Sequence, residues 1–456
     1  MRAGYLCCLA FIFYFVSLCP AEFRVNTHTP NDQKNADIAM EPGGNFMVVW
    51  SSYRQDGSSN GIFGRRFDPN CDPIGNEFQI NKTSSGNQTE PAVAMDAAAG
   101  FLVAWYGPGL IDEDEEDIFA RRYGPNGSIF GDDFRVNRLT RGGQIYPDAA
   151  ISGNGTFIIV WESENVPDEG KKAICGQLYN SNGMAIGTEF ILNEEPSVCR
   201  YPTVAADGDG NFIVAWLDDQ SNNSILARLL AADGSMLTHT FEVNSVDFSS
   251  VTRPSVSMNI AGDFIVAWDG DPELAHLDDI HARLFDRHGA PLGEQFIVNT
   301  ARDGPQRYPA VALNDRREFI IVWEIQIGSE TSEREIFGQR FINIGEPTGV
   351  EFLINTYVEG DQRYPSVAIN EAGQFVTVWQ SDDQDGSGYG IFADAGRIIG
   401  AADFNEDGSI DFLDYAILAE NWRDEGASSP TDLIYDNRIN EHDLVEFCHQ
   451  WLRPGR

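Results

Sequence analysis

Residues 403–414 place side-chain oxygens at the spacing that a calcium ion requires. The segment reads D-F-N-E-D-G-S-I-D-F-L-D, with Gly408 at position 6, where such a loop turns sharply. The backbone carbonyl of Ser409 at position 7 can also face the ion. Calcium takes about six to eight oxygen ligands at flexible distances. The predicted side-chain ligands stand at positions 1, 3, 5, 9 and 12: Asp403, Asn405, Asp407, Asp411 and Asp414.

A second, less complete copy of this loop runs from residue 432 to residue 443. Ile434 removes the ligand at position 3, Asn437 replaces the glycine, and Arg438 supplies the carbonyl at position 7. Asparagine adopts left-handed geometry more readily than most residues, so the turn is kept. We therefore predict a weaker calcium site here. Its side-chain ligands at positions 1, 5, 9 and 12 are Asp432, Asp436, Asn440 and Asp443.

An amphipathic helix is expected after each loop. Leu413, Ile417, Leu418 and Trp422 follow the first loop at helical spacing, and Leu444, Phe447, Trp451 and Leu452 follow the second. Two calcium loops that end in Asp and lead into helices, over residues 401–454, resemble a type I dockerin module. The first loop with "LDYAILAENW" is the most specific part of this resemblance.

The resemblance implies that the module docks onto a cohesin. Dockerins attach secreted proteins, many of them carbohydrate-active, to a cell-surface or scaffold complex. The positions that select the partner in the family correspond to Phe412, Leu413, Glu441 and His442. These residues differ from the small hydroxyl residues common there, which leaves the partner's identity open. Without a scaffold, the module would serve intramolecular or cell-wall attachment.

The rest of the chain is organised by a tryptophan repeat. Each repeated tryptophan ends a run of the form F-x-V-x-W or a close variant, such as FLVAW at 101–105. The seven residues are Trp50, Trp105, Trp161, Trp216, Trp268, Trp323 and Trp379, spaced by 55, 56, 55, 52, 55 and 56 residues. A constant period of this length indicates a repeat architecture.

Each repeat contains four short apolar segments separated by turn residues. In the second unit they are PAVAM at 91–95, FLVAW at 101–105, IFARRY at 118–123 and DFRVN at 133–137. Segments of this length, rich in Val, Ile and Phe and bounded by Gly, Asp, Asn and Pro, predict strands. The repeats are therefore expected to be all-β, with four strands per unit, stacked as a propeller or as a linear solenoid.

The ends of the repeat region favour a closed ring. The last unit lacks its fourth strand before residue 400, whereas an unpartnered F-x-V-N strand stands at 23–26. The N-terminal strand can complete the last unit and so remove two exposed sheet edges. We therefore predict a seven-bladed β-propeller over residues 22–399, followed by the small α-helical, EF-hand-like calcium module at 400–456.

Residues 1–21 are predicted to be a signal peptide that is cleaved after Ala21. Arg2 precedes the apolar run 6–18, which is too short to cross a bilayer comfortably. The protein is thus expected to be secreted or at the cell surface, with no membrane span; a lipid anchor at Cys19 is the alternative. Cys175 is expected to be a buried core residue, and a Cys175–Cys199 disulfide is left open.

The charge balance argues against nucleic acid and anionic membranes as partners. The chain has 31 basic and 70 acidic residues, a net charge of -39. Acids gather between the second and third strands, as at 112–117, 269–279 and 382–385. These loops are expected to make one face of the ring strongly negative. Solvated charge that keeps the protein soluble explains this pattern, and binding of a cation is the alternative.

An Arg or Tyr before a proline recurs where the innermost strands begin. If the ring closes, these side chains gather near the mouth of the central channel. A structural interpretation has the tyrosines packing between blades and the arginines bridging to acidic loops. A ligand ring for sugars or carboxylates is the other interpretation. Its candidate residues are Arg200, Tyr201, Arg307, Tyr308, Arg363 and Tyr364.

Enzyme machinery is hard to find in the sequence. The seven histidines show no metalloprotease spacing, and no serine stands in a nucleophile elbow. We expect a calcium-binding, dockerin-bearing propeller that binds or displays a ligand such as a glycan and is linked to polysaccharide processing. A glycoside hydrolase with paired carboxylates and a purely structural surface protein are the alternatives.

Overall fold

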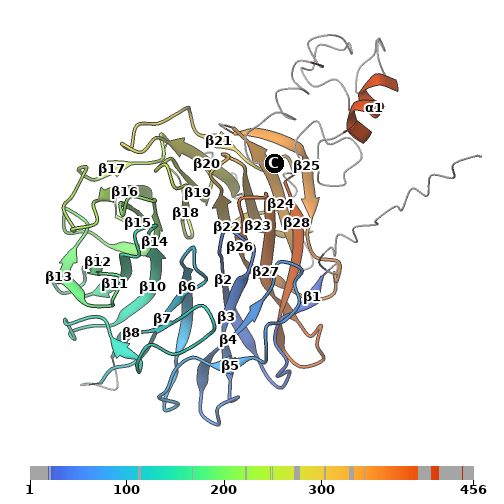
Figure 1. Ribbon diagram of the computed structural model, residues 1–456. Coiled ribbons are helices and arrows are strands. Elements are labelled where there is room, and N and C mark those ends of the chain that lie inside the picture. Colours follow the sequence, from blue (N-terminus) through green and yellow to red (C-terminus); the bar gives the residue numbers. More distant parts are fainter. Residues whose placement is uncertain are drawn as a thin grey trace, which may run out of the picture.

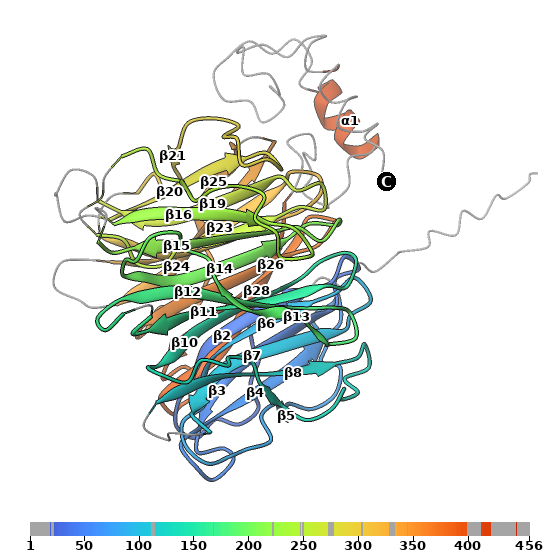
Figure 2. The ribbon, with the colours of Figure 1, turned by 90° about the vertical axis from the view of Figure 1, so that its left-hand side faces the viewer.

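The propeller region forms seven antiparallel sheets of four strands each, arranged around a ring (Figure 1). The computed structural model describes Cys19, residues 22–398 apart from 111–114, 167, 221–222, 247, 249, 272–277, 302–303, 328–332 and 344, and residues 412–420 and 444. In the view turned by 90°, the sheets stack side by side like blades (Figure 2). The prediction of an all-β, seven-bladed propeller is confirmed.

The strands of blades 1 to 4 follow one another from the channel outward. Blade 1 has β2 (Gln33–Met40), β3 (Phe46–Tyr53), β4 (Asn60–Phe67) and β5 (Phe78–Gln79), and blade 2 has β6 (Thr89–Met95), β7 (Phe101–Pro108), β8 (Glu116–Tyr123) and β9 (Phe134–Arg135). Blade 3 has β10 (Gln144–Ile151), β11 (Phe157–Glu164), β12 (Lys172–Tyr179) and β13 (Ala185–Ile191), and blade 4 has β14 (Cys199–Ala206), β15 (Phe212–Asp218), β16 (Ser224–Leu230) and β17 (Phe241–Glu242).

Blades 5 and 6 repeat this order, and the outer strand of blade 7 is the N-terminal strand β1. Blade 5 has β18 (Ser255–Met258), β19 (Phe264–Gly270), β20 (Asp279–Phe285) and β21 (Phe296–Ile297), and blade 6 has β22 (Gln306–Leu313), β23 (Phe319–Gln326), β24 (Arg334–Ile342) and β25 (Glu346–Leu353). Blade 7 has β26 (Gln362–Ile369), β27 (Gln374–Asp382), β28 (Tyr389–Arg397) and β1 (Phe23–Arg24).

The core lies between neighbouring sheets, because the second strand of each blade is covered on both faces. Every residue of β15 is buried, and each of the seven repeated tryptophans is at most 1% exposed. One core cluster joins Met47 and Val49 of blade 1 to Val103 and Trp105 of blade 2. The F-x-V-x-W run is apolar apart from Thr377 of blade 7, because both of its faces meet a neighbouring blade.

The asparagine of each F-x-V-N run fastens the outer strand to the third strand. Its Oδ1 accepts the N–H of an isoleucine, as Asn137 does from Ile118 at 2.8 Å, and its Nδ2 donates to the carbonyl two residues onward, Leu139 at 2.8 Å. These asparagines are Asn26, Asn81, Asn137, Asn193, Asn244, Asn299 and Asn355. The side chain thus extends the pairing of the outer strand, which in five of the blades has only two residues.

Acidic residues before the F-x-V-N run join neighbouring blades. Glu189 of blade 3 accepts the N–H groups of Arg138 and Leu139 of blade 2, at 2.7 and 2.8 Å. Glu351 of blade 6 binds blade 5 in the same way. Several of the chain's many acids therefore hold the ring together, where carboxylates accepting backbone N–H groups form strong hydrogen bonds.

The ring is closed by the N-terminal segment, as the sequence predicts. Phe23 pairs with Ala393 and Arg24 with Phe392 in antiparallel register. Asn26 continues this pairing by accepting the N–H of Ile391 at 2.8 Å. On the channel side, β26 contacts β2 as the other neighbouring inner strands contact each other. Two sheet edges are thereby covered.

The structure does not contain the Cys175–Cys199 disulfide that the sequence left open. Cys175 and Cys199 are both buried and carry free thiols, so no disulfide joins them. Cys175 is 4% exposed and stands opposite Trp161, which confirms its place in the core. Burial raises the pKa of each thiol to about 12, so neither is a reactive thiolate near neutral pH. A disulfide instead joins Cys19 to Cys71.

Candidate functional site

Six of the seven innermost strands carry a bulge where they begin, and the bulge turns one side chain toward the channel mouth. The register of β10 against β11, for example, shifts between Ile145 and Asp148. In six blades the bulged residue has a positive φ between 48° and 55°, although none is glycine: Asn35, Glu90, Tyr146, Tyr201, Tyr308 and Tyr364. Such backbone is costly for bulky residues, so the neighbouring blade must hold it in place.

The residue after the repeated tryptophan provides this support in three of the blades. Glu324 of blade 6 accepts the N–H of Tyr364 at 3.2 Å, and Gln380 of blade 7 accepts the N–H of Asn35 at 3.1 Å. Glu162 does the same for Tyr201 at 3.4 Å. Burial raises the pKa of Glu324 to about 7, against the opposing effect of nearby Arg363. The bulge is thus fixed across the blade interface.

Blade 5 departs from this pattern at Arg253. The residue after the tryptophan in blade 4 is Leu217, whose side chain has no acceptor. Arg253 is not among the residues with positive φ, and β18 begins only at Ser255. Thr252 bonds instead to Asp269 of its own blade, at 2.8 Å from both its N–H and its hydroxyl. The sevenfold repeat is therefore broken at one position of the mouth.

The bulged residues surround a cavity of about 320 Å³ at the channel mouth. Its lining comes from the inner strands of all seven blades and combines the four tyrosines of the bulges with Arg253 and Glu90. Asp37 and Asp148 line it as well. Aromatic faces, one guanidinium and three carboxyl groups thus converge on a single space.

Arg253 and Glu90 form an ion pair across the mouth. Arg253 Nη1 lies 3.2 Å from Glu90 Oε2, which joins blade 5 to blade 2. The guanidinium also lies 4.7 Å from the ring centroids of both Tyr146 and Tyr201. Burial acts to lower the pKa of Arg253, but the charge of Glu90 and the tyrosines raise it overall. The cation is therefore held firmly between two aromatic rings.

Tyr308 and Tyr364 form a second aromatic pair in the lining. Their ring centroids are 4.8 Å apart, at an interplanar angle of 65°. Burial raises the pKa of Tyr308 to about 12, and Tyr364 adds to this shift. The Tyr308 hydroxyl therefore stays protonated near neutral pH and can donate and accept hydrogen bonds.

Asp37 and Asp148 join neighbouring inner strands beneath the mouth. Asp37 accepts the N–H of Val93 and the hydroxyl of Ser366, each at 2.8 Å. Asp148 accepts the N–H of Val204 at 2.8 Å. Burial raises the pKa of Asp148 to about 7, and the charge of Asp37 raises it further. Burial raises the pKa of Asp37 too.

Stability is expected to fall with rising pH because of Asp148. Its unfolded pKa is near 3.8 and its folded pKa about 7, so between these values the folded chain binds the extra proton. The free energy of unfolding should lose up to about 1.4 kcal/mol per pH unit from this group between pH 4 and 7, and nothing further above 7. Urea unfolding of wild type and Asp148→Asn across this range measures the effect. Identical slopes in the two proteins would contradict it.

The structure separates the six predicted ligand residues into two sets. Tyr201, Tyr308 and Tyr364 line the cavity, but the preceding arginines do not. The arginines bridge to acidic side chains: Arg200 to Asp219 at 3.5 Å, Arg307 to Asp278 at 2.6 Å and Arg363 to Glu324 at 3.6 Å. Neighbours in a strand point to opposite sides, so only one of each pair can reach the channel.

Sequence reasoning missed Glu90, Asp37, Asp148 and the special position of Arg253. A signal for the first and last was present, because Glu90 and Arg253 are the charged residues at the pre-proline position of the repeat. The two aspartates follow the proline position, where other blades have Ala, Ser or Thr. Aligning the repeats at this proline would have shown all four residues as departures.

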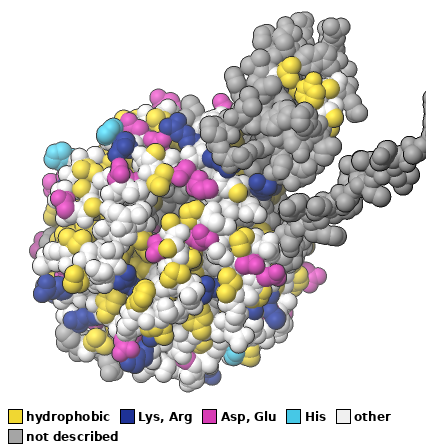
Figure 3. All heavy atoms as spheres, viewed as in Figure 1, with side chains coloured by type: hydrophobic (Ala, Val, Ile, Leu, Met, Phe, Trp, Pro, Cys, Tyr) yellow, Lys and Arg dark blue, Asp and Glu magenta, His cyan; other side chains and the backbone are white. Residues whose placement is uncertain are grey.

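On the propeller surface outside the cavity, acidic side chains are interspersed with basic, apolar and neutral ones. On the face seen in Figure 3, Asp and Glu lie among basic, apolar and neutral side chains. Two acids of the predicted acidic segments 112–117 and 269–279 are buried: Asp117 accepts from Asn137 at 2.6 Å, and Asp278 from Arg307 at 2.6 Å. Part of the loop charge is therefore engaged in bonds within the propeller.

Most of the predicted calcium ligands lie outside the described residues. Helix α1 (Phe412–Glu420) begins where the sequence places a helix after the first loop, and it includes Leu413 and Asp414. Residues 403–411 and 432–443, with Glu441 and His442, fall outside the description. Within the described part of the chain, no group of three or more His, Cys, Asp or Glu side chains is placed to hold a metal.

No helix among the described residues is long and apolar enough to cross a membrane.

Comparisons with known proteins extend only to the fold. No family model matches the chain, and no curated protein matches its sequence. Similar solved structures include a protein of unknown function from Dyadobacter fermentans (12% identity, TM-score 0.49, 83% of this chain and 98% of that one). A polysaccharide lyase of family PL25, an ulvan lyase, gives 10% identity and a TM-score of 0.49, covering 83% and 94% of the two chains. The β-propeller domain of the Trilobed protease from Pyrococcus furiosus is 11% identical, with a TM-score of 0.45, and the match covers 80% of this chain and 96% of that one. All these TM-scores are below 0.5, so none of these similarities bears on function.

Proposed function

We propose that this protein is an extracellular carbohydrate-binding propeller that holds a neutral sugar at the mouth of its channel. The observation that carries the proposal is the cavity in which the Tyr308 and Tyr364 rings stand beside carboxyl groups and a guanidinium. Aromatic rings pack against the apolar faces of sugars. Carboxylates accept hydrogen bonds from sugar hydroxyls, and Arg253 can donate to sugar oxygens.

The size of the cavity favours a small ligand. Its volume of about 320 Å³ is at the lower end of the range of small-molecule sites. A chain end or a single sugar unit fits such a space better than a long polymer segment. The pocket would therefore recognise the terminus of a glycan.

The charges of the lining favour an uncharged ligand. Three carboxyl groups line the cavity, and the one guanidinium is already paired with Glu90. An acidic sugar would meet like charge from Asp37 and Asp148 wherever these are ionised. Hydroxyl groups can instead bond to Asp148 in either of its protonation states.

Binding of neutral oligosaccharides to the full chain tests this function. Tyr308→Ala should weaken binding about 10-fold or more, equal to about 1.4 kcal/mol. Arg307→Gln is the matched control, because Arg307 precedes Tyr308 but bonds to Asp278 away from the cavity. Isothermal titration calorimetry of both variants, after thermal unfolding shows that they are folded, gives the comparison.

Three results would contradict the proposal. Absence of binding across a panel of neutral plant and algal glycans would leave a structural role. Equal losses in Tyr308→Ala and Arg307→Gln would place the ligand elsewhere. Release of reducing sugar from the same panel would instead make the protein a glycoside hydrolase.

We further propose that the C-terminal module binds calcium and attaches the propeller to a cohesin-like partner at the cell surface or in an extracellular complex. The oxygen spacing of residues 403–414 supports this, because it supplies the ligand number that calcium needs. The helix of Phe412–Glu420 begins at the expected end of this loop.

Calcium titration of the full chain should show a tight site that Asp407→Ala removes. Asp436→Ala should affect only a weaker second step, because the second loop lacks a ligand at position 3. Asp382→Ala, at the end of strand β27 in the acidic segment 382–385, is the control and should leave both steps unchanged. A tight step that persists in Asp407→Ala would contradict the assignment of the ligands.

A further inference from the structure

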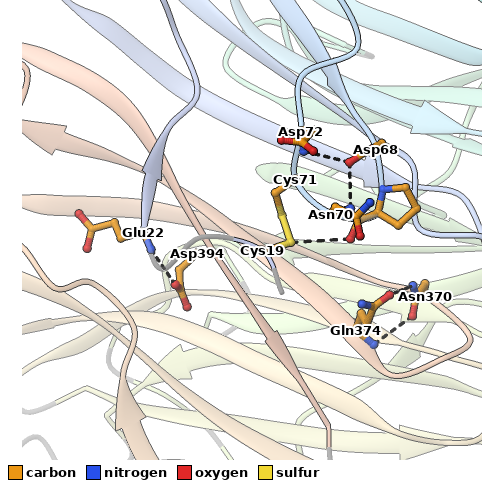
Figure 4. Close-up of a disulfide and its surroundings, with 10 residues drawn as sticks. Cys19, Glu22, Asp68, Asn70, Cys71, Asp72, Asn370, Gln374 and Asp394 are labelled. Carbon is orange, nitrogen blue, oxygen red and sulfur yellow. Dashed lines mark hydrogen bonds between the residues drawn. A yellow bond between two sulfur atoms is a disulfide. The ribbon is translucent and has the colours of Figure 1, made fainter. Parts of the chain in front are cut away.

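A disulfide joins the segment before β1 to a turn of blade 1. Cys19 and Cys71 are bonded, with their Cα atoms 5.2 Å apart (Figure 4). Cys71 stands in the turn between β4 and β5, where its N–H donates to Asp68 O at 3.0 Å. Cys71 is buried and Cys19 is half-buried.

Cys71 occupies a position that is glycine in the corresponding turns of blades 2 to 6. Each of these turns bonds the N–H of this residue to the carbonyl three residues earlier. Cys71 has a φ of 62°, and the glycines have φ between 74° and 105°: Gly127, Gly183, Gly234, Gly289 and Gly345. Left-handed backbone suits glycine and strains a residue with a side chain. A cysteine at this position therefore gives up favourable turn geometry, which a bond through its sulfur explains.

The bond crosses the seam at which the ring closes. Cys19 precedes β1, which completes blade 7, whereas Cys71 belongs to blade 1. The Phe23 ring contacts the Phe67 ring across the same seam, with centroids 5.7 Å apart. Glu22 accepts the N–H of Tyr357 in blade 6 at 3.3 Å. The disulfide thus tethers the strand that closes the propeller.

We propose that export processing cuts the chain on the N-terminal side of Cys19, and that the mature protein carries the Cys19–Cys71 disulfide. A cut after Ala21, which the sequence predicts, would remove Cys19 and leave Cys71 unpaired. In forming the bond, the two thiols lose two protons and two electrons to a disulfide oxidant of the export compartment, which becomes a dithiol. The Cys19 sulfur is then not available for a lipid thioether.

The position of the new amino terminus differs between a cut before Cys19 and a cut after Ala21. After a cut at Ala21, the α-ammonium of Glu22 would lie beside Asp394, whose Oδ1 is 3.1 Å from the Glu22 nitrogen (Figure 4). That arrangement is chemically reasonable. The structure alone therefore permits both termini, but only the earlier cut accounts for a cysteine at the glycine position of the turn.

Mass spectrometry of the full chain, exported by a bacterial host, tests the proposal. After alkylation of free thiols without reduction, proteolysis should yield a peptide with Cys71 linked to one with Cys19, and reduction should release both. In Cys71→Gly, which restores the common turn, the linked peptide should be lost completely and Cys19 should be alkylated. Cys199→Ser is the control and should keep the link.

Two outcomes would overturn the proposal. One is a mature terminus at Glu22 with an alkylated Cys71. The other is a lipid-modified Cys19 beside an alkylated Cys71. The proposal instead expects a chain that begins at or before Cys19. On reduction of its one disulfide this chain gains two hydrogens, about 2 Da, so the intact mass distinguishes it from both of these outcomes.

Discussion

Asn26→Ala is expected to open the ring and make the protein oligomerise, whereas Asn299→Ala should not. The two side chains make equivalent bonds: Asn26 accepts from Ile391 at 2.8 Å and Asn299 from Ile280 at 2.7 Å. Each substitution leaves a buried N–H without its acceptor, which should lower the free energy of unfolding by about 1 to 3 kcal/mol. Only Asn26, however, fastens a strand that is not continuous with its blade.

The difference should appear as a change in mass. The ladder of β1 with β28 has two residue pairs, at Phe23 and Arg24, and Val25 adds one backbone bond to Ile391. Besides the contacts of Glu22 and Phe23, the strand therefore depends on Asn26 and the disulfide. Freed of β1, the nine-residue strand β28 presents an open edge that can pair with another chain. Light scattering in reducing buffer should show concentration-dependent dimers for Asn26→Ala and monomers for Asn299→Ala. Monomers in both cases would show that the seam does not depend on this side chain.

Trp323→Phe should destabilise the protein more than Trp50→Phe, although both indoles are fully buried. Trp323 Nε1 donates to Gln306 Oε1 at 2.6 Å. Trp50 Nε1 has no hydrogen-bond partner in the described part of the chain. Both variants lose packing, but only Trp323→Phe leaves a buried amide oxygen without its donor. The extra loss should be about 1 to 3 kcal/mol.

A third variant checks the origin of this difference. Trp379 also donates to a glutamine, Gln362, at 3.0 Å, so Trp379→Phe should behave like Trp323→Phe. Urea unfolding followed by circular dichroism measures the free energy of unfolding of all three variants. Each variant keeps six of the repeated tryptophans. Equal losses at all three positions would mean that packing alone sets the stability of these sites.

The repeat predicted the propeller because the tryptophan interval reports a structural period. The strand that begins at Phe23 closes blade 7 as expected. In five blades, however, the outer strand is shorter than the F-x-V-N run; β9, for example, spans only Phe134–Arg135. At the end of each run, the asparagine side chain makes the hydrogen bond to the third strand that a backbone group would make in a longer strand. Strand propensity cannot show this, because it does not distinguish a backbone bond from a side-chain bond.

The candidate site was predictable only in part for a geometric reason. The sequence shows Arg and Tyr side by side before the proline, but not which of them faces the channel. The bulge decides this, since a shift of one residue moves a side chain to the other side of the strand. It places Tyr308 in the lining and turns Arg307 to Asp278. The contact of Arg253 with Glu90 spans 163 residues and depends on the closed ring.

The closure of the ring also sets an order of events when the chain is made. The N-terminal strand is synthesised first, yet Asn26 must wait for Ile391, 365 residues later, before it finds its partner. Closing a loop of this length is slow compared with forming the hairpins within a blade. We therefore expect the blades to assemble in sequence and the circle to close last. The channel mouth, which draws on all seven blades, cannot take its final shape until then.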